Sequence, residues 1–133
     1  MHLDLEELGC TRQIECEELD ARARHNPWAE RRLQYLVRSS GRAVAFISFD
    51  IWPERDFIVL YELFVASGHR RRGIGSTLVE EAKRIASMRG YKRIIVRPTP
   101  LSEDVSEEAL TAWYQSLGFR LRTAEPGTLE LEV

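Results

Sequence analysis

The part of the sequence best suited to chemistry is a basic, glycine-containing turn at residues 66–76, ASGHRRRGIGS. An apolar run ends at Val65 and a helical pattern begins near Ile74, so the turn joins a strand to the N-terminus of a helix. Helix N-termini carry unpaired N–H groups and partial positive charge, and glycines let an anion approach them closely. The three arginines that begin at Arg70 add positive charge. These residues predict an anion site, with a solvated basic turn as the alternative.

Two familiar phosphate-binding loops do not fit this turn. Gly68 and Gly73 have the Walker A spacing, but Ile74 and Gly75 stand where that loop needs a lysine and a hydroxyl residue. A dinucleotide-binding fingerprint needs a third glycine three residues after Gly75, where this chain has Leu78. A nucleic-acid partner is also disfavoured, because the basic patch is short and the net charge of the chain is −2.

A second segment, AWYQSLGF at residues 112–119, ends a predicted helix. With it, the chain resembles the GNAT (Gcn5-related N-acetyltransferase) superfamily in two places. Residues 70–75, RRRGIG, resemble the R-x-x-G-x-G acyl-CoA loop, and residues 113–119 resemble the second signature, an aromatic residue followed by Tyr-x-x-x-Gly-Phe. Two signatures in this order on elements of the right type are more specific than either alone. The resemblance is close from Tyr61 to Phe119 and topological elsewhere.

The resemblance implies that acetyl-CoA is the co-substrate. In this superfamily the loop amides hold the pyrophosphate, and the preceding strand pairs its backbone with the pantetheine arm. The strand at 93–97 would then diverge and leave a cleft for the thioester. The positions that match the cofactor-binding roles are Leu63, Phe64, Val65, Arg70, Arg71, Arg72, Gly73, Ile74, Gly75 and Ser76.

Tyr114 matches the superfamily's usual general acid. The implied mechanism is direct attack of a neutral primary amine on the thioester, after which the thiolate leaves. A phenol with an ordinary pKa of about 10 can protonate that thiolate and is itself protonated at neutral pH. The alternative is that Tyr114 is a core aromatic beside Trp113 and Phe119.

The general base is less well defined by the sequence, and Glu62 is the candidate. The position four residues before Val65, where a base often sits in this superfamily, is Tyr61. Strand alternation from Val65 points Glu62 away from the cofactor side unless a bulge re-aims it. This favours proton transfer through water, and Glu62 is then either a base or a structural or substrate-pocket carboxylate. Glu107 also departs from the pattern, because many relatives carry an asparagine seven residues before the tyrosine.

The expected function is therefore an acetyl-CoA-dependent N-acetyltransferase that acts on a primary amine of a small molecule or peptide. The alternative is a non-catalytic CoA-binding or regulatory module on the same fold. The histidines are scattered without metal-ligand spacing, so we expect no metal. The sequence identifies neither the acceptor nor the oligomeric state, and a homodimer stays open.

The elements that position these residues form an α/β domain of the α+β type. Strands are expected at 3–8, 32–38, 43–51, 57–66, 91–98, 119–123 and 128–133. Helices are expected at 11–24 with Thr11 as N-cap, at 74–88, and at 104–117 with Asp104 as N-cap. The expected architecture is a mixed, mostly antiparallel sheet with helices on both faces and two splayed strands that form the acyl-CoA cleft.

Length and composition indicate the class of protein. The 133 residues, 44% hydrophobic and 30% charged, fit one globular domain at 1–133. No apolar stretch reaches the roughly 20 residues that a membrane span needs, and the acidic N-terminus does not resemble a secretory signal. Cys10 and Cys16 do not make a disulfide framework. We expect a cytoplasmic protein without a membrane partner, in which the role of the first 30 residues is undefined.

Overall fold

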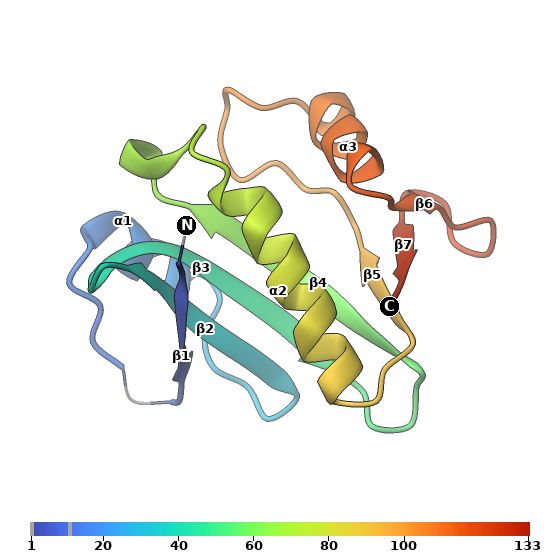
Figure 1. Ribbon diagram of the computed structural model, residues 1–133, viewed down its shortest axis with the longest axis horizontal. Coiled ribbons are helices and arrows are strands. Elements are labelled where there is room, and N and C mark those ends of the chain that lie inside the picture. The colour runs from blue at the N-terminus through green and yellow to red at the C-terminus, as the bar shows by residue number, and fades with distance from the viewer. Residues whose placement is uncertain (1, 11) are drawn as a thin grey trace.

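The computed structural model describes residues 2–10 and 12–133 (Figure 1). One short 3-10 turn, Ser67–His69, precedes the second helix. The strands and helices, in chain order, are β1 Asp4–Leu8, α1 Glu17–Arg24, β2 Arg32–Ser39, β3 Arg42–Ile51, β4 Phe57–Val65, α2 Ile74–Met88, β5 Arg93–Val96, α3 Glu107–Ser116, β6 Arg120–Leu121 and β7 Leu129–Glu132. No helix of the described residues has the length and hydrophobicity that a membrane crossing requires.

The strands form one seven-stranded sheet in the order β1-β2-β3-β4-β5-β7-β6. Among the strand pairs of the described residues, only β4–β5 is parallel, so the predicted mixed, mostly antiparallel sheet is confirmed. The long apolar strand β4 occupies the middle of the order, as expected for a strand whose two faces are both covered.

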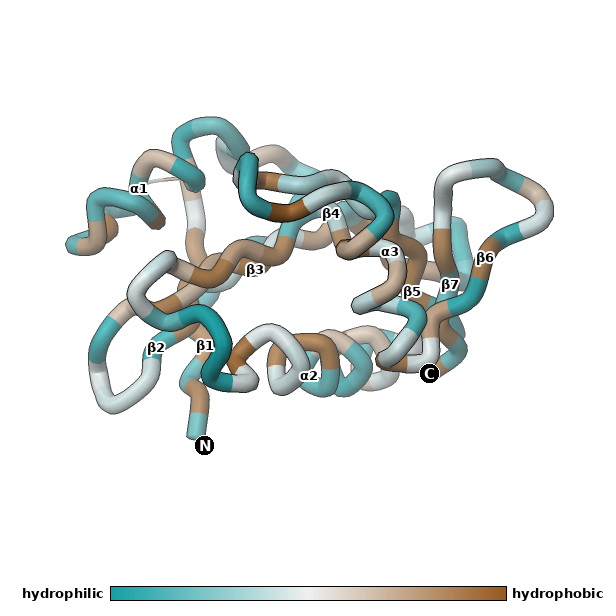
Figure 2. Tube along the Cα trace, turned by 90° about the horizontal axis from the view of Figure 1, so that it is seen from above, coloured by the Kyte–Doolittle hydropathy of each residue, from teal (hydrophilic) through white to brown (hydrophobic). Residues whose placement is uncertain are grey.

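The two faces of the sheet are covered by different helices, which Figure 2 shows on opposite sides of the strands. Leu78, Val79 and Ala82 of α2 share one buried cluster with side chains of β2 to β5 and of α3. Leu19 and Ala23 of α1 join a second cluster on the other face. Neighbouring residues such as Leu36 and Val37 of β2, or Phe46 and Ile47 of β3, lie in different clusters because successive side chains point to opposite faces. The predicted arrangement of helices on both faces is therefore confirmed.

The sheet opens between β4 and β5. Their pairing runs only from Phe57↔Arg93 to Leu60↔Val96, whereas the pairing of β4 with β3 continues to Val65. The edge of β4 from residue 61 to residue 65 is therefore not covered by β5. This divergence is the splay that the sequence analysis expected.

A β-bulge lies in β4 at this opening. Ser48 of β3 pairs with Glu62 and the next residue, Phe49, pairs with Leu60, so Tyr61 is the extra residue. Leu60 belongs to the cluster on the α2 side. A regular strand would place Glu62 on that same face, inside an apolar core. The bulge instead turns Glu62 to the α1 face.

Two helix starts differ from the expectation. α1 begins at Glu17 after Cys16, and the expected cap, Thr11, lies outside the described residues. α3 begins at Glu107 with Ser106 as its N-cap, because the Ser106 hydroxyl accepts the Ala109 N–H at 3.0 Å. The prediction that Asp104 caps this helix was wrong, since its carboxylate accepts the Ser102 hydroxyl.

Candidate active site

The entry to α2 has the local geometry of an anion cradle. Gly73 is the N-cap with φ 77°, a left-handed conformation that glycine adopts without strain. The first main-chain bond of the helix runs from Thr77 N–H to the Gly73 carbonyl at 3.1 Å. The N–H groups of residues 74–76 thus precede the helical bonding pattern, and Gly73 has no side chain to cap them.

These N–H groups border a pocket between α2, α3 and the end of β4. Eight of the ten residues predicted for the cofactor line it: Leu63, Val65, Arg70, Arg71, Gly73, Ile74, Gly75 and Ser76. We call it the loop pocket. α3 supplies the opposite wall, including Trp113 and Tyr114.

The other two predicted residues lie outside the loop pocket. Phe64 packs in the cluster under α1 and faces the neighbouring cavity instead. Arg72 is exposed, and its Nη1 lies 2.9 Å from His69 Nδ1. Each leaves a backbone group near the site, but neither places its side chain in the loop pocket.

Arg70 contacts the end of β4, α1 and the loop before α3. Its Nε donates to the Val65 carbonyl at 3.0 Å, and its guanidinium lies over the Phe64 ring. Glu18 of α1 and Asp104 lie 3.7 and 3.8 Å from its terminal nitrogens. These contacts turn Arg70 toward the strand rather than toward the N-terminus of α2.

A second cavity, the sheet pocket, lies along the uncovered edge of β4. Its walls come from the C-terminal part of α1, from β4 and from the loop between β5 and α3. It shares six lining residues with the loop pocket, namely Leu63, Val65, Arg70, Val105, Leu110 and Tyr114. The two pockets therefore adjoin where the strands diverge.

Tyr114 stands at this junction. It is 5% exposed and packs edge-on against Trp113 and Phe119, with ring centroids 4.9 and 5.3 Å away. Burial raises the pKa of the Tyr114 phenol well above its ordinary value. The phenol is consequently protonated at neutral pH. Tyr114 is thus both a core aromatic and a wall of both pockets, so the two roles considered for it are compatible.

Glu62 lines the sheet pocket and is 7% exposed. Its face of β4 is opposite to that of Leu63 and Val65, yet all three residues border this pocket because the strand edge is uncovered there. Burial raises the pKa of Glu62, and the positive charge of Arg22 opposes the shift.

The ion pair at Glu62 leaves one oxygen without a hydrogen bond. Arg22 Nε lies 2.9 Å from Glu62 Oε2, but the two groups are not aligned as donor and acceptor. Among the described residues, neither atom has a hydrogen-bond partner. The Glu62 carboxylate thus lies in the wall of the sheet pocket with one oxygen in an ion pair but outside any hydrogen bond of the described residues.

Some residues of the site were not identified by the sequence analysis as contributors. Trp113 was only part of a signature, yet its ring atoms Cζ2 and Cη2 lie 3.1 and 3.3 Å from where a β-carbon on Gly75 would stand. Arg22 and Asn26 come from the N-terminal region that the sequence left undefined. An Asn-Pro pair indicates only a turn, so no local signal could have assigned Asn26.

Glu107 is exposed at the first turn of α3, where an acidic side chain complements the helix dipole. The described residues hold no group of three or more His, Cys, Asp or Glu side chains placed to bind a metal.

Comparison with protein families identifies the chain. The model of the acetyltransferase (GNAT) family matches residues 3–119. The chain belongs to the GNAT acetyltransferase family. A curated relative, N-acetyltransferase family 8 member 3 of Rattus norvegicus, is 31% identical over 90 residues, which are 65% of this chain and 37% of the relative. The matched region thus spans little more than a third of that relative.

Solved GNAT structures share the fold. A GNAT family acetyltransferase from Elizabethkingia anophelis with acetyl-CoA bound has a TM-score of 0.70 at 16% identity, covering 98% of each chain. The PaiA N-acetyltransferase from Thermoplasma acidophilum in complex with coenzyme A has a TM-score of 0.61 at 17% identity, covering 85% of this chain and 66% of its own. At these identities the likeness establishes the fold of this GNAT chain.

Proposed function

We propose that this GNAT chain is an acetyl-CoA-dependent N-acetyltransferase that acts on a primary amine of a small molecule or peptide. The observation that carries the proposal is the meeting of two pockets at Tyr114, one bordered by the α2 N-terminus and the other by a buried carboxylate. A group-transfer enzyme needs such an arrangement, because donor and acceptor must meet in one place.

The loop pocket is the proposed acetyl-CoA site. The N–H groups of residues 74–76 and the nearby Arg71 side chain suit the pyrophosphate, and the uncovered edge of β4 suits an extended amide-containing arm. Bound acetyl-CoA supplies a thioester whose carbonyl carbon accepts a nucleophile. Leu63 and Val65 place apolar side chains along this path, and Arg70 holds the strand end in position through the Val65 carbonyl.

The sheet pocket is the proposed acceptor site, and Glu62 is its proton acceptor. An ammonium group must lose a proton before its nitrogen can attack a carbonyl. Glu62 can take that proton because its carboxylate lines the cavity and its burial raises its pKa. A water molecule between the amine and Glu62 would relay the proton to the same carboxylate.

Tyr114 is the proposed proton donor. The C–N bond forms as the C–S bond breaks, and the leaving sulfur takes the electron pair and then the phenol proton. The raised pKa of Tyr114 keeps that proton in place until the thiolate develops. The nitrogen loses its second proton as the amide forms, and that proton restores the Tyr114 phenol. The products are the N-acetylated amine and free CoA, and the proton held by Glu62 returns to solvent.

The proposal is tested by offering acetyl-CoA with a panel of primary amines and peptides. Free thiol and acetylated product, measured by absorbance and mass spectrometry, should rise in equal amounts with at least one acceptor class. The competing function is a non-catalytic CoA-binding module. Tight CoA binding in calorimetry with no acetylated product across the panel would favour that module.

A further inference from the structure

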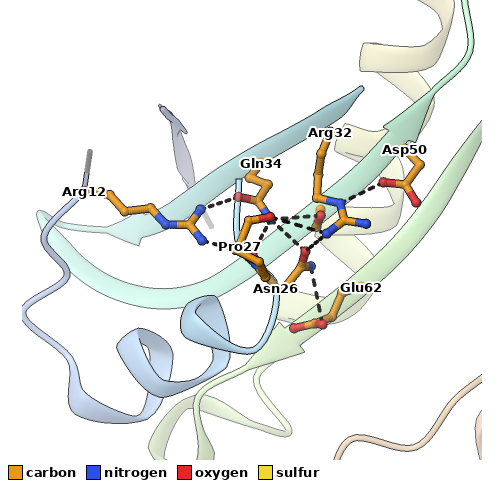
Figure 3. A network of polar contacts seen from close by, with 8 residues as sticks. Arg12, Asn26, Pro27, Arg32, Gln34, Asp50 and Glu62 are labelled. Atoms are coloured by element: carbon orange, nitrogen blue, oxygen red, sulfur yellow. Dashed lines mark hydrogen bonds and ion pairs between the residues drawn. The ribbon is translucent and has the colours of Figure 1, made fainter. Parts of the chain in front are cut away.

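A network of buried polar side chains lies on the α1 face of the sheet, below the loop that follows α1 (Figure 3). Asn26, Gln34 and Ser48 are at most 1% exposed, and Glu62 of the proposed site belongs to the same group. They come from the loop, β2, β3 and β4, respectively. Burial of so many polar groups is tolerated only where they satisfy one another.

The arginines of the network fix the orientation of its two amide side chains. Arg32 can only donate, and its Nη1 lies 2.8 Å from Asn26 Oδ1. Gln34 Nε2 donates to the same oxygen at 2.9 Å, while the Gln34 oxygen accepts from Arg12. Because Arg12 holds that oxygen, Gln34 keeps its NH₂ group toward Asn26. Two donors therefore fix the side-chain oxygen of Asn26.

The NH₂ group of Asn26 is consequently turned toward Glu62, with Nδ2 3.5 Å from Oε1. This is a long hydrogen bond, so its main effect is the direction of the amide dipole at a buried carboxylate. A flipped amide would present an oxygen to Glu62 and would give up the contacts from Arg32 and Gln34.

The charged and titratable groups that face Glu62 are few. Arg22 of α1, His25 at the α1 C-cap and Arg32 of β2 act on it in the same direction as Asn26, and the facing residue of β3 is the uncharged Ser48. Across the sheet pocket lie Arg70, Arg97 and the phenol of Tyr114. Burial raises the pKa of Glu62, whereas Arg22, the Asn26 donor, Arg32 and His25 oppose that rise. The orientation of the Asn26 amide is therefore one of the factors that set the pKa of this carboxyl group.

We propose that Asn26 is a positioning residue for the acceptor site: locked by Arg32 and Gln34, it keeps its donor side toward Glu62 and so holds the carboxylate in the ionised form that takes a proton from the amine. This proposal rests on the proposed function, in which Glu62 is the proton acceptor. It also gives the N-terminal region a part in the site, because Arg12 orients Gln34 and the chain after α1 supplies Asn26.

The decisive variants are Asn26→Asp and Asn26→Ala. Asn26→Asp keeps the shape and the contacts with Arg32 but turns a carboxylate oxygen toward Glu62. Asn26→Ala removes the donor to Glu62, together with the oxygen that accepts from Arg32 and Gln34, and adds no charge. The titration of the Glu62 ¹³C-carboxyl signal is followed by NMR without acetyl-CoA, and Glu62→Gln identifies the signal. The midpoint should rise by about one pH unit or more in Asn26→Asp and by less in Asn26→Ala. The acidic limb of kcat/KM should move the same way.

Gln13→Glu is the matched control. It makes the same amide-to-carboxylate change at an exposed position, and the Glu62 midpoint should stay at the wild-type value. Folded Asn26→Asp and Asn26→Ala proteins that titrate like the wild type would overturn the proposal. So would an equal shift in Gln13→Glu, because the effect would then be general charge.

A second variant keeps the test open if the Asn26 variants do not fold. Arg12→Met, in the half-buried outer part of the network, removes the donor that orients Gln34, so a smaller rise in the Glu62 midpoint is expected. Arg24→Met removes an exposed cation of α1 outside the network and should cause none. An unchanged midpoint in folded Arg12→Met would then reject the proposal. Absence of acetyl transfer in every protein would reject the proposed function, while the titration would still decide the role of Asn26.

Discussion

At the scale of single residues, Tyr114 is the sharpest test of the chemistry. Tyr114→Phe keeps the ring that packs between Trp113 and Phe119 and removes only the hydroxyl. Because general acids contribute roughly 10²–10⁴-fold, kcat should fall by about that factor while the Kd for CoA changes little. Thiol release and calorimetry measure the two quantities. Tyr91→Phe, a half-buried tyrosine outside both pockets, should leave kcat unchanged.

A full rate in Tyr114→Phe, with chemistry shown to limit turnover, would reduce Tyr114 to a core aromatic. Its buried position alone would then explain the side chain. The KM for acetyl-CoA separates the catalytic role of Tyr114 from its packing role. Loss of a general acid lowers kcat and leaves KM unchanged, whereas a packing defect in the pocket wall raises KM.

Glu62 predicts a pH dependence with a defined sign. A base must be ionised, so kcat/KM should fall as the pH drops through the pKa of Glu62, which burial places above the ordinary 4.5. Glu62→Gln should lower the rate and abolish this acidic limb, since glutamine keeps the size but accepts no proton in this range. Glu130→Gln, a half-buried carboxylate paired with Arg93, is the control. A limb that persists in Glu62→Gln and follows the pKa of the amine would indicate that water removes the proton.

At the scale of elements, the contact between α2 and α3 controls the loop pocket. Gly75→Glu should abolish CoA binding in calorimetry for two reasons. Its β-carbon would meet the Trp113 ring at 3.1 Å, and its charge would oppose the pyrophosphate at the helix N-terminus. Gly9→Glu adds the same charge at a glycine with open space and should bind CoA normally. Unchanged affinity in a folded Gly75→Glu protein would refute the cofactor assignment.

At the scale of the whole molecule, CoA binding should stabilise the folded state, because its pocket is formed by segments that are far apart in sequence. The loop pocket draws its walls from β4, α2 and α3, so a ligand there binds only the folded chain. CoA at 100 times its Kd should then stabilise the protein by about 2.7 kcal/mol. Thermal unfolding should show a Tm higher by several degrees with CoA. Gly75→Glu should show no such rise, and an equal rise in both proteins would mean that CoA binds elsewhere.

The sequence by itself determined the order of the elements, the position of the central strand and both family signatures. These features are local: α2 follows from apolar residues at helical spacing, and the turn into it follows from Gly73 and the arginines before it. Helix ends were predicted less well, because Ser106 and Asp104 are equally good caps by type and only the folded contacts choose between them.

Only the tertiary structure decided which groups meet at the site. The bulge at Tyr61 depends on the register between β3 and β4, and alternation along one strand carries no information about that register. The close approach of Trp113 to Gly75 depends on how two helices pack. The turn of Asn26 toward Glu62 depends on the donors Arg32 and Gln34 of β2. Contacts between distant segments set all three, and no short stretch of sequence contains them.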